Sequence, residues 1–212
     1  EKSYTKIQTT GATVPLETRP QHLATNHAHI NYYIDVTTLK ARTKEAEEVA
    51  QALVGMYLYD TVIDTIVCME RTEVIGAFLA EELAKGGFLS TNAHNSIYVI
   101  SPEFNNNSQI IFRDNLIPMI RDKHVMILMA SVTTGRTLNK AVESIQYYGG
   151  ILQGASAIFS AMDSLDGVPI KSVFGKKDLP DYTYSDYRDC PLCKAGKKID
   201  ALVNTFGYSP MG

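Results

Sequence analysis

The chain has 212 residues, 45% hydrophobic and 20% charged, and this near-average composition predicts a folded domain rather than a collagen-like or disordered chain. Its net charge of −3 lacks the concentrated basic surface that nonspecific nucleic-acid binding needs, so we expect no nucleic-acid partner. Apolar runs such as Val125 to Ala130 are far shorter than the roughly 20 residues of a membrane span, so we expect no membrane-spanning segment. Three cysteines are too few for a disulfide scaffold and favour a cytoplasmic protein.

The first elements along the chain are a strand, a helix and a second strand. Residues 1–40 carry few helix signals, and Ile30 to Val36 is typical of a strand in a small flanking element. Residues 44–58 place apolar side chains three or four positions apart, which predicts an amphipathic helix. The short, β-branched run Val62 to Cys68 predicts a strand that is buried on both faces.

The alternation of helices and strands continues along the chain. The same criteria predict a helix over 74–83 ending at Gly86-Gly87, strands over 96–100 and 123–130, a helix over 138–148 and a strand over 151–159. This order predicts a doubly wound, mostly parallel α/β sheet flanked by helices. We expect a single domain with a flanking element at 1–40, a core at 41–175 and a tail at 176–212 that wraps over the surface.

Ligands of such sheets bind where the strands end, which directs attention to the loops that follow them. The loops in question follow Cys68, Ile100, Ala130 and Phe159.

The loop after the strand 123–130 has the features of an anion site. It reads Ser131, Val132, Thr133, Thr134, Gly135, Arg136, Thr137 and leads into a helix. Amides at a helix N-terminus lack intrahelical partners, the helix dipole favours negative charge, and Gly135 permits a close approach. The threonine hydroxyls and the arginine add further donors. The alternative is that Thr133 or Thr134 simply caps the helix.

This loop resembles the end of the type I phosphoribosyltransferase signature, in which an apolar strand, two acidic residues and two further residues precede Thr-Thr-Gly-x-Thr. The resemblance implies that residues 131–137 hold the 5′-phosphate of phosphoribosyl pyrophosphate (PRPP) or of a nucleotide. It extends toward orotate phosphoribosyltransferase through Asn31 to Asp35, through the βα order over residues 20–175, and through Asp189 to Gly196. It also implies Mg²⁺ as cofactor, a homodimer, and a role in pyrimidine biosynthesis.

The chain departs from this family at several positions. The acidic pair falls on Met129 and Ala130, and the segment 95–111, where the family has a basic mobile loop, contains no lysine or arginine. Phe159 to Met162 stands where an arginine meets orotate. The pyrophosphate loop falls on bulky and charged residues, which are Met69, Glu70, Arg71 and Thr72, followed by Glu73.

Two functions from different classes therefore stay open. One is a phosphoribosyltransferase that acts on a nitrogenous base, with catalytic residues unknown. The other is a catalytically degenerate relative that binds a nucleotide or PRPP as a regulatory module. A more remote third is another sugar-phosphate reaction with Glu70 or Glu73 as base. The simpler interpretation of these two glutamates is a solvated first helical turn, in which they complement the helix dipole.

Cys190-Pro191-Leu192-Cys193 has the spacing of zinc and redox motifs. A structural zinc site needs four ligands, and His27 and His29 are the candidates for the two that the cysteines do not supply. A redox pair of the thioredoxin kind is weakly supported, because such pairs lie at a strand-to-helix turn near the start of their domain. We favour a tight turn that closes the tail, with no metal. The isolated His22, His94 and His124 stand in polar contexts and are expected at the surface.

Overall fold

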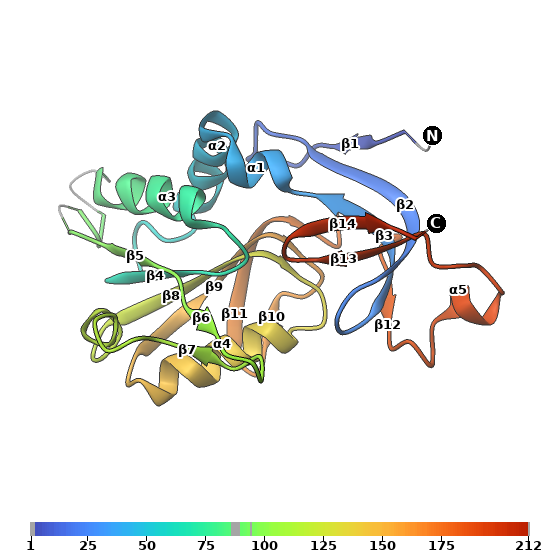
Figure 1. Ribbon diagram of the computed structural model, residues 1–212. Helices are drawn as coiled ribbons and strands as arrows, with labels where there is room; N and C mark the ends of the chain where they lie inside the picture. The colour runs from blue at the N-terminus through green and yellow to red at the C-terminus, as the bar shows by residue number, and fades with distance from the viewer. Residues whose placement is uncertain (1–2, 86–89, 94, 212) are drawn as a thin grey trace.

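The computed structural model describes residues 3–85, 90–93 and 95–211, which form two six-stranded sheets and one two-stranded sheet (Figure 1). The core sheet has the order β10-β11-β9-β8-β4-β5. Its strands from β11 to β5 are all parallel, and only β10 is antiparallel, which confirms the expected fold class. The strands are β4 (Thr65–Cys68), β5 (Tyr98–Ile100), β8 (His124–Val132), β9 (Ile151–Ser160), β10 (Ser164–Leu165) and β11 (Val168–Gly175).

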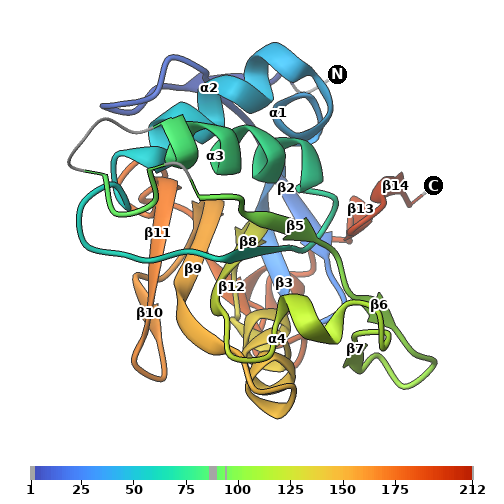
Figure 2. The same cartoon turned by 90° about the vertical axis from the view of Figure 1, so that its left-hand side faces the viewer.

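Helices cover both faces of the core sheet (Figure 2). One layer contains α2 (Thr43–Val54) and α3 (Glu73–Lys85), preceded by the short α1 (Thr37–Ala41), and the other contains α4 (Arg136–Tyr147). Successive side chains of β8 alternate between these layers, since Met126 and Leu128 join the cluster with α2 and α3 whereas Ile127 joins the cluster with α4. Burial on both faces explains why the β8 sequence is almost wholly apolar.

The second sheet combines both ends of the described chain. Its path is β12-β3-β2-β13-β14, with β1 paired to β2. The parallel β2–β13 pairing shows that the segment after Lys176 does not merely wrap over the surface but completes the N-terminal sheet. The strands are β1 (Thr5–Ile7), β2 (Leu16–Ala24), β3 (His29–Asp35), β12 (Tyr184–Ser185), β13 (Ala201–Asn204) and β14 (Gly207–Pro210), with α5 (Pro191–Lys194) between β12 and β13.

Smaller elements complete the described chain. Strands β6 (Glu103–Phe104) and β7 (Ile110–Ile111) form a hairpin beside α4, and η1 (Ile117–Met119) is a 3₁₀ turn before β8. The link from β9 to its parallel neighbour β11 runs through residues 161–167 without a helix. None of the helices in the described ranges is both long and apolar enough to span a membrane.

The element boundaries differ from the expected ones at a few places. The helix expected over 44–58 ends at Val54, and β8 continues beyond residue 130 to Val132. The strand expected from Val62 begins only at Thr65. The predicted helix end at Gly86-Gly87 and the predicted surface residue His94 lie outside the described residues.

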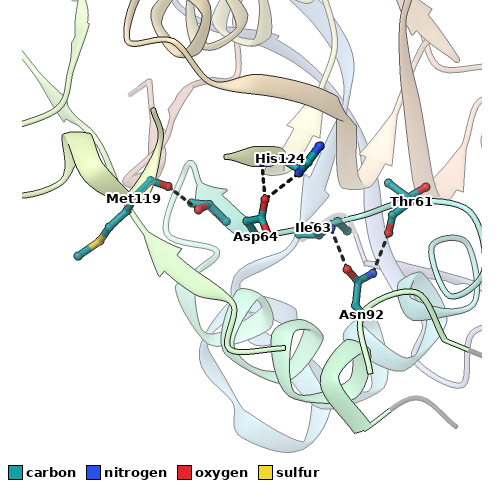
Figure 3. Close-up of polar contacts among 7 residues, drawn as sticks. Thr61, Ile63, Asp64, Asn92, Met119 and His124 are labelled. Atoms are coloured by element: carbon teal, nitrogen blue, oxygen red, sulfur yellow. Dashed lines mark hydrogen bonds and ion pairs between the residues drawn. The ribbon is translucent and has the colours of Figure 1, made fainter. Parts of the chain in front are cut away.

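A buried asparagine explains why β4 starts late (Figure 3). The Ile63 backbone N–H donates to the Asn92 side-chain oxygen at 2.8 Å, and the Asn92 amide group donates to the Thr61 carbonyl at 2.8 Å. These backbone groups are thus satisfied by a side chain and not by a neighbouring strand.

An ion-pair contact holds the start of β4 beside β8 (Figure 3). The Asp64 carboxylate accepts hydrogen bonds of 2.8 Å from both the backbone N–H and the ring Nδ1 of His124. His124 is therefore half-buried and bonded, unlike the free surface residue that we expected. Burial raises the pKa of the Asp64 carboxyl, but the hydrogen bonds from His124 and the nearby charges more than offset this, so the pKa lies below its ordinary value.

Replacing Asp64 by Asn is expected to lower the free energy of unfolding by about 1 kcal/mol at pH 7, because charge-assisted hydrogen bonds are lost at a partly exposed site. A depressed pKa stabilises the fold above the unfolded value of roughly 3.9 and loses that effect as the pH falls through the folded pKa. Urea unfolding of both proteins at pH 7 and pH 3 tests this, with the exposed Asp114→Asn as control. An equal loss at both pH values would exclude the ionised carboxylate as the cause.

Candidate functional site

A cavity of about 660 Å³ lies at the carboxyl ends of β4 and β8, and both sheets contribute to its walls. The end of β8, the following turn and the start of α4 supply the continuous run Met129 to Leu138. The loop after β4, the end of β3, α1, the β2–β3 turn and the β13–β14 turn supply the other walls. All seven residues predicted to hold a phosphate, Ser131 to Thr137, line this one cavity.

The turn before α4 depends on Gly135. This residue has φ 76°, and a Cβ atom there would lie 3.0 Å from both Cδ atoms of Leu165. Any other residue would therefore be strained and crowded. Gly135 is also the N-cap of α4, so neither Thr133 nor Thr134 occupies the cap position considered from the sequence. The first N–H groups of α4 have no acceptors within the helix, and that of Arg136 makes a long contact of 3.4 Å with the Thr134 hydroxyl.

Thr133 is held in place from the tail of the chain. Its hydroxyl oxygen lies 2.9 Å from the Tyr182 hydroxyl, and the Tyr182 ring packs on Phe159 with 5.0 Å between the centroids. Burial raises the pKa of Tyr182 to about 12, so the phenol is neutral and can donate to Thr133. A residue some fifty positions away thus orients one hydroxyl of the turn before α4.

The loop after β4 divides into supporting and cavity-lining residues. Met69 and Thr72 are buried, and the Thr72 hydroxyl contacts the carbonyls of Met69 at 2.8 Å and Leu128 at 3.1 Å. Glu70 and Arg71 line the cavity and have φ angles of 56° and 64°. Two consecutive left-handed residues that are not glycine cost about 1–2 kcal/mol each, and such strain is common at functional sites.

The Glu70 carboxylate turns inward and contacts the end of β8. Its Oε2 atom accepts hydrogen bonds from the backbone N–H of Ala130 at 3.0 Å and of Ser131 at 3.2 Å. Lys40 donates to the Glu70 carbonyl at 2.9 Å and holds the loop. Burial raises the pKa of the Glu70 carboxyl above its ordinary value, and the two amides and the Lys40 charge offset only part of this.

The solvated first-turn interpretation therefore fails for Glu70. Glu73 is the first residue of α3, as that interpretation requires, and its Oε1 atom accepts a hydrogen bond of 2.6 Å from the Ser101 hydroxyl.

Three residues that the sequence did not reveal complete the charge and shape of the cavity. Lys40 is partly buried, and burial lowers its pKa while the Glu70 charge opposes this. The Arg71 guanidinium lies 5.0 Å from the centre of the Phe206 ring, which comes from the β13–β14 turn. His27 also lines the cavity, and burial together with the charge of Arg136 lowers its pKa. Lys40, His27 and Phe206 lie in no recognisable motif, because α1 brings in Lys40 and turns of the second sheet bring in His27 and Phe206.

Two segments that the sequence analysis compared with catalytic loops lie elsewhere. The β6–β7 hairpin is attached to α4, where the Ile110 carbonyl accepts from the Ser144 hydroxyl at 3.0 Å and the Ser108 carbonyl accepts from Lys140 at 3.3 Å. Phe159 is buried, and the Ser160 hydroxyl donates to the Met162 carbonyl. Neither segment contributes to the cavity wall among the described residues.

The structure places two histidines beside the cysteine pair. Cys190 and Cys193 lie beside His22 and His29, and the ligand atoms of all four residues lie within 4.8 Å of one another. His27, the other candidate from the sequence, faces the cavity instead. His22 is buried, with 4% of its surface exposed, and is not the surface residue that we expected.

The raised pKa of Glu70 gives a stability prediction. A carboxyl with a raised folded pKa contributes its stability below the unfolded pKa and loses it as the pH rises through the folded value. Glu70→Gln is therefore expected to raise the free energy of unfolding at pH 7, with a smaller gain at pH 4.5, because an amide oxygen still accepts from both amides. Glu70→Ala, which removes the acceptor, is expected to lower it. Urea unfolding measures both, and a loss for Glu70→Gln at pH 7 would contradict the assignment.

No protein-family model matches this chain, and no curated protein is similar to it. Solved structures do match. An adenine phosphoribosyltransferase from Thermoanaerobacter pseudethanolicus has a TM-score of 0.51 and 17% identity, covering 68% of this chain and 88% of that one. An orotate phosphoribosyltransferase from Mycobacterium tuberculosis H37Rv, solved in complex with PRPP, has a TM-score of 0.50 and 13% identity, covering 69% and 82%.

A third match is only part of a longer protein. The UMP synthase of Leishmania donovani has a TM-score of 0.50 and 18% identity over 72% of this chain, which corresponds to 32% of the synthase. The matched proteins thus include enzymes named for orotate and for adenine, and the low identities do not distinguish between them. The chain therefore has the fold of the type I phosphoribosyltransferases.

Proposed function

We propose that the cavity binds the 5′-phosphate of a phosphorylated ribose, either PRPP or a nucleotide, on the turn formed by residues 131–137. The observation that carries this proposal is the left-handed Gly135 at the start of α4, where the first-turn N–H groups have no acceptors within the helix and their residues line the cavity. A phosphate there receives amide hydrogen bonds and the favourable end of the helix dipole. The fold likeness to a protein solved with PRPP supports the same ligand class.

The size and charge of the cavity suit such a ligand. Its volume of about 660 Å³ falls within the range of about 300–1,000 Å³ of small-molecule sites. Arg136 and Lys40 line it from different sides and supply positive charge near the phosphate turn and near the loop after β4. The Phe206 ring and Tyr33 add aromatic surface on the side of the second sheet, which suits a base or a ribose.

The enzymatic form of the proposal is transfer of the phosphoribosyl group to a nitrogenous base, as in the orotate enzymes. In that reaction pyrophosphate leaves as positive charge develops on the ribose, so the protein must orient both groups and stabilise their charges. Arg71 lies at the cavity where the pyrophosphate loop was expected, and it and the nearby Lys40 are cations that could face a pyrophosphate. The Glu70 carboxylate reaches the end of β8 next to Ala130, near the positions where the family has its acidic pair.

The described residues that line this cavity do not fit a resident Mg²⁺ site. Glu70 and Glu73 are the carboxylates among its described lining residues, and each already accepts hydrogen bonds from the chain. A protein site for Mg²⁺ usually combines one or two free carboxylates with substrate phosphates. A Mg²⁺ ion would therefore have to arrive with the pyrophosphate of its substrate, and we derive no step through it.

A second candidate function is a binding module without turnover. It is favoured by the position of the β6–β7 hairpin, which packs on α4 and brings no basic side chain to the cavity. In this form the protein senses a nucleotide or PRPP. Both forms share the phosphate turn and differ only in turnover. The homodimer implied by the family resemblance stays a prediction for either form.

Gly135→Val is expected to lower the affinity for PRPP and for nucleoside monophosphates by more than about 100-fold, because two charge-assisted hydrogen bonds of about 1.5–3 kcal/mol each are lost. Calorimetric titration with and without Mg²⁺ measures this. Gly149→Val is the matched control, since Gly149 has φ 82° at the other end of α4 and does not line the cavity. Equal affinity of Gly135→Val and the unaltered protein would remove the proposed phosphate site.

A pyrophosphate-release assay with candidate bases separates the two forms of the proposal.

We also expect Ala130→Asp to strengthen PRPP binding, but only in the Glu70→Gln background. With Glu70 ionised, a carboxylate at position 130 would face a second negative charge across the 3.0 Å contact. If Ala130→Asp gives the same change in affinity in both backgrounds, the Glu70 carboxylate does not occupy this part of the site.

A further inference from the structure

We propose that His22, His29, Cys190 and Cys193 form a structural Zn²⁺ site that ties α5 to the β2–β3 hairpin. The four side chains come from three separate parts of the chain, namely β2, β3 and the turn that starts α5. Their ligand atoms all lie within 4.8 Å of one another. This cluster is separate from the cavity, since none of its four residues lines the cavity wall.

Four of the six separations between the ligand atoms are close to those of a tetrahedral zinc site. Zn–S bonds of about 2.3 Å and Zn–N bonds of about 2.0–2.1 Å at tetrahedral angles place two nitrogens ~3.3 Å apart and a sulfur and a nitrogen ~3.6 Å apart. The His22 Nε2 to His29 Nδ1 distance is 3.3 Å. The sulfur-to-nitrogen distances are 3.4 Å for Cys190 to His22, 3.6 Å for Cys193 to His22 and 3.3 Å for Cys193 to His29.

The contacts around His22 fix the ring in the form that a metal needs. Its Nδ1 atom lies 3.0 Å from the Lys197 carbonyl and 3.1 Å from the Lys198 carbonyl. Since carbonyl oxygens only accept, Nδ1 is the donor in these contacts, and Nε2 is the ring atom that faces the cluster. A hydrogen bond from the other ring nitrogen to a backbone carbonyl is the usual support of a zinc-bound histidine.

Asp200 holds the backbone of His22 in place. The His22 backbone N–H donates to the Asp200 carboxylate at 2.8 Å, and the Asp200 N–H donates to the His22 carbonyl at 2.7 Å.

The composition of the cluster selects the metal. Two thiolates and two neutral imidazoles match the Cys₂His₂ set of structural zinc sites. The charges of two thiolates and one Zn²⁺ cancel, so a site with buried Cys190 and His22 carries no net charge into the protein. Four protein ligands leave no open position for a substrate, which indicates a structural and not a catalytic role.

The location of the cluster shows what the metal would stabilise. It lies beside the parallel pairing of β2 with β13, where Ala201 is opposite Leu23. The β13–β14 turn beyond it carries Phe206 to the cavity wall. A metal at the cluster would therefore hold one wall of the cavity in place without touching its ligand.

The test uses the full chain without a histidine tag, kept reduced. We expect about one Zn²⁺ per chain by elemental analysis, and one equivalent of Co²⁺ after removal of Zn²⁺ with a chelator. Bound Co²⁺ should show tetrahedral visible bands and thiolate-to-cobalt charge transfer. Loss of a residue that supports a metal ligand costs about 10–100-fold in metal affinity. Cys193→Ser and His29→Gln remove the ligands themselves, so each should lower the metal affinity by at least about 100-fold.

Two further variants separate ligation from a merely structural role. His27→Gln is the matched control in the same hairpin and should bind Co²⁺ like the unaltered protein. Cys193→His should keep one equivalent of Co²⁺ with weaker charge transfer, because one thiolate replaces two. Hydrogen exchange at β13–β14 should speed up when the metal is removed. The proposal is overturned if the reduced protein takes up no Zn²⁺ or Co²⁺, or if the Cys190→Ser, Cys193→Ser double variant gives the same cobalt spectrum.

Discussion

The end of β8 is the constraint on which the architecture of the cavity depends. This strand is buried between β4 and β9, but it extends beyond the end of β4 at Cys68. Backbone N–H groups beyond that point need acceptors, because unpaired polar groups in a protein interior are costly. The Glu70 side chain supplies the acceptor for two of them. The strained loop after β4 and the contact from Lys40 follow from placing that carboxylate there.

The cavity is a composite of the core and the second sheet. Gly135 and its turn come from the core, whereas Phe206 comes from a strand turn near the end of the described chain. The contacts that join these parts include the hydrogen bond of Thr133 to Tyr182 and the packing of Arg71 on Phe206, and a shared apolar cluster lies behind them. The core thus supplies most of the charge, and the second sheet supplies apolar and aromatic surface that closes over it.

Local patterns in the sequence were sufficient for the core but not for the contacts between distant segments. The continuous apolar run of β8 predicts a strand because both of its faces are buried. The apolar stripe over residues 44–58 predicts a helix because one of its faces is buried. Gly135 was identifiable because a left-handed turn before a helix demands glycine.

The inward Glu70 was not predictable, since its conformation depends on a neighbouring strand. His22 was mistaken for a surface residue because a bulge between Pro20 and Leu23 and a partner 178 positions away decide its environment.

The parallel pairing of β13 with β2 also has a consequence for the order in which the protein forms. During synthesis, β2 emerges long before β13, and the whole core sheet is made in between. β1 pairs with Leu16 to Thr18, but until β13 arrives the Leu23–Ala24 end of β2 lacks its parallel partner, and an unpaired strand edge is a template for association with other chains. Pairing across such a sequence separation is slow, so the nascent second sheet should be the part of this protein that most needs chaperone protection.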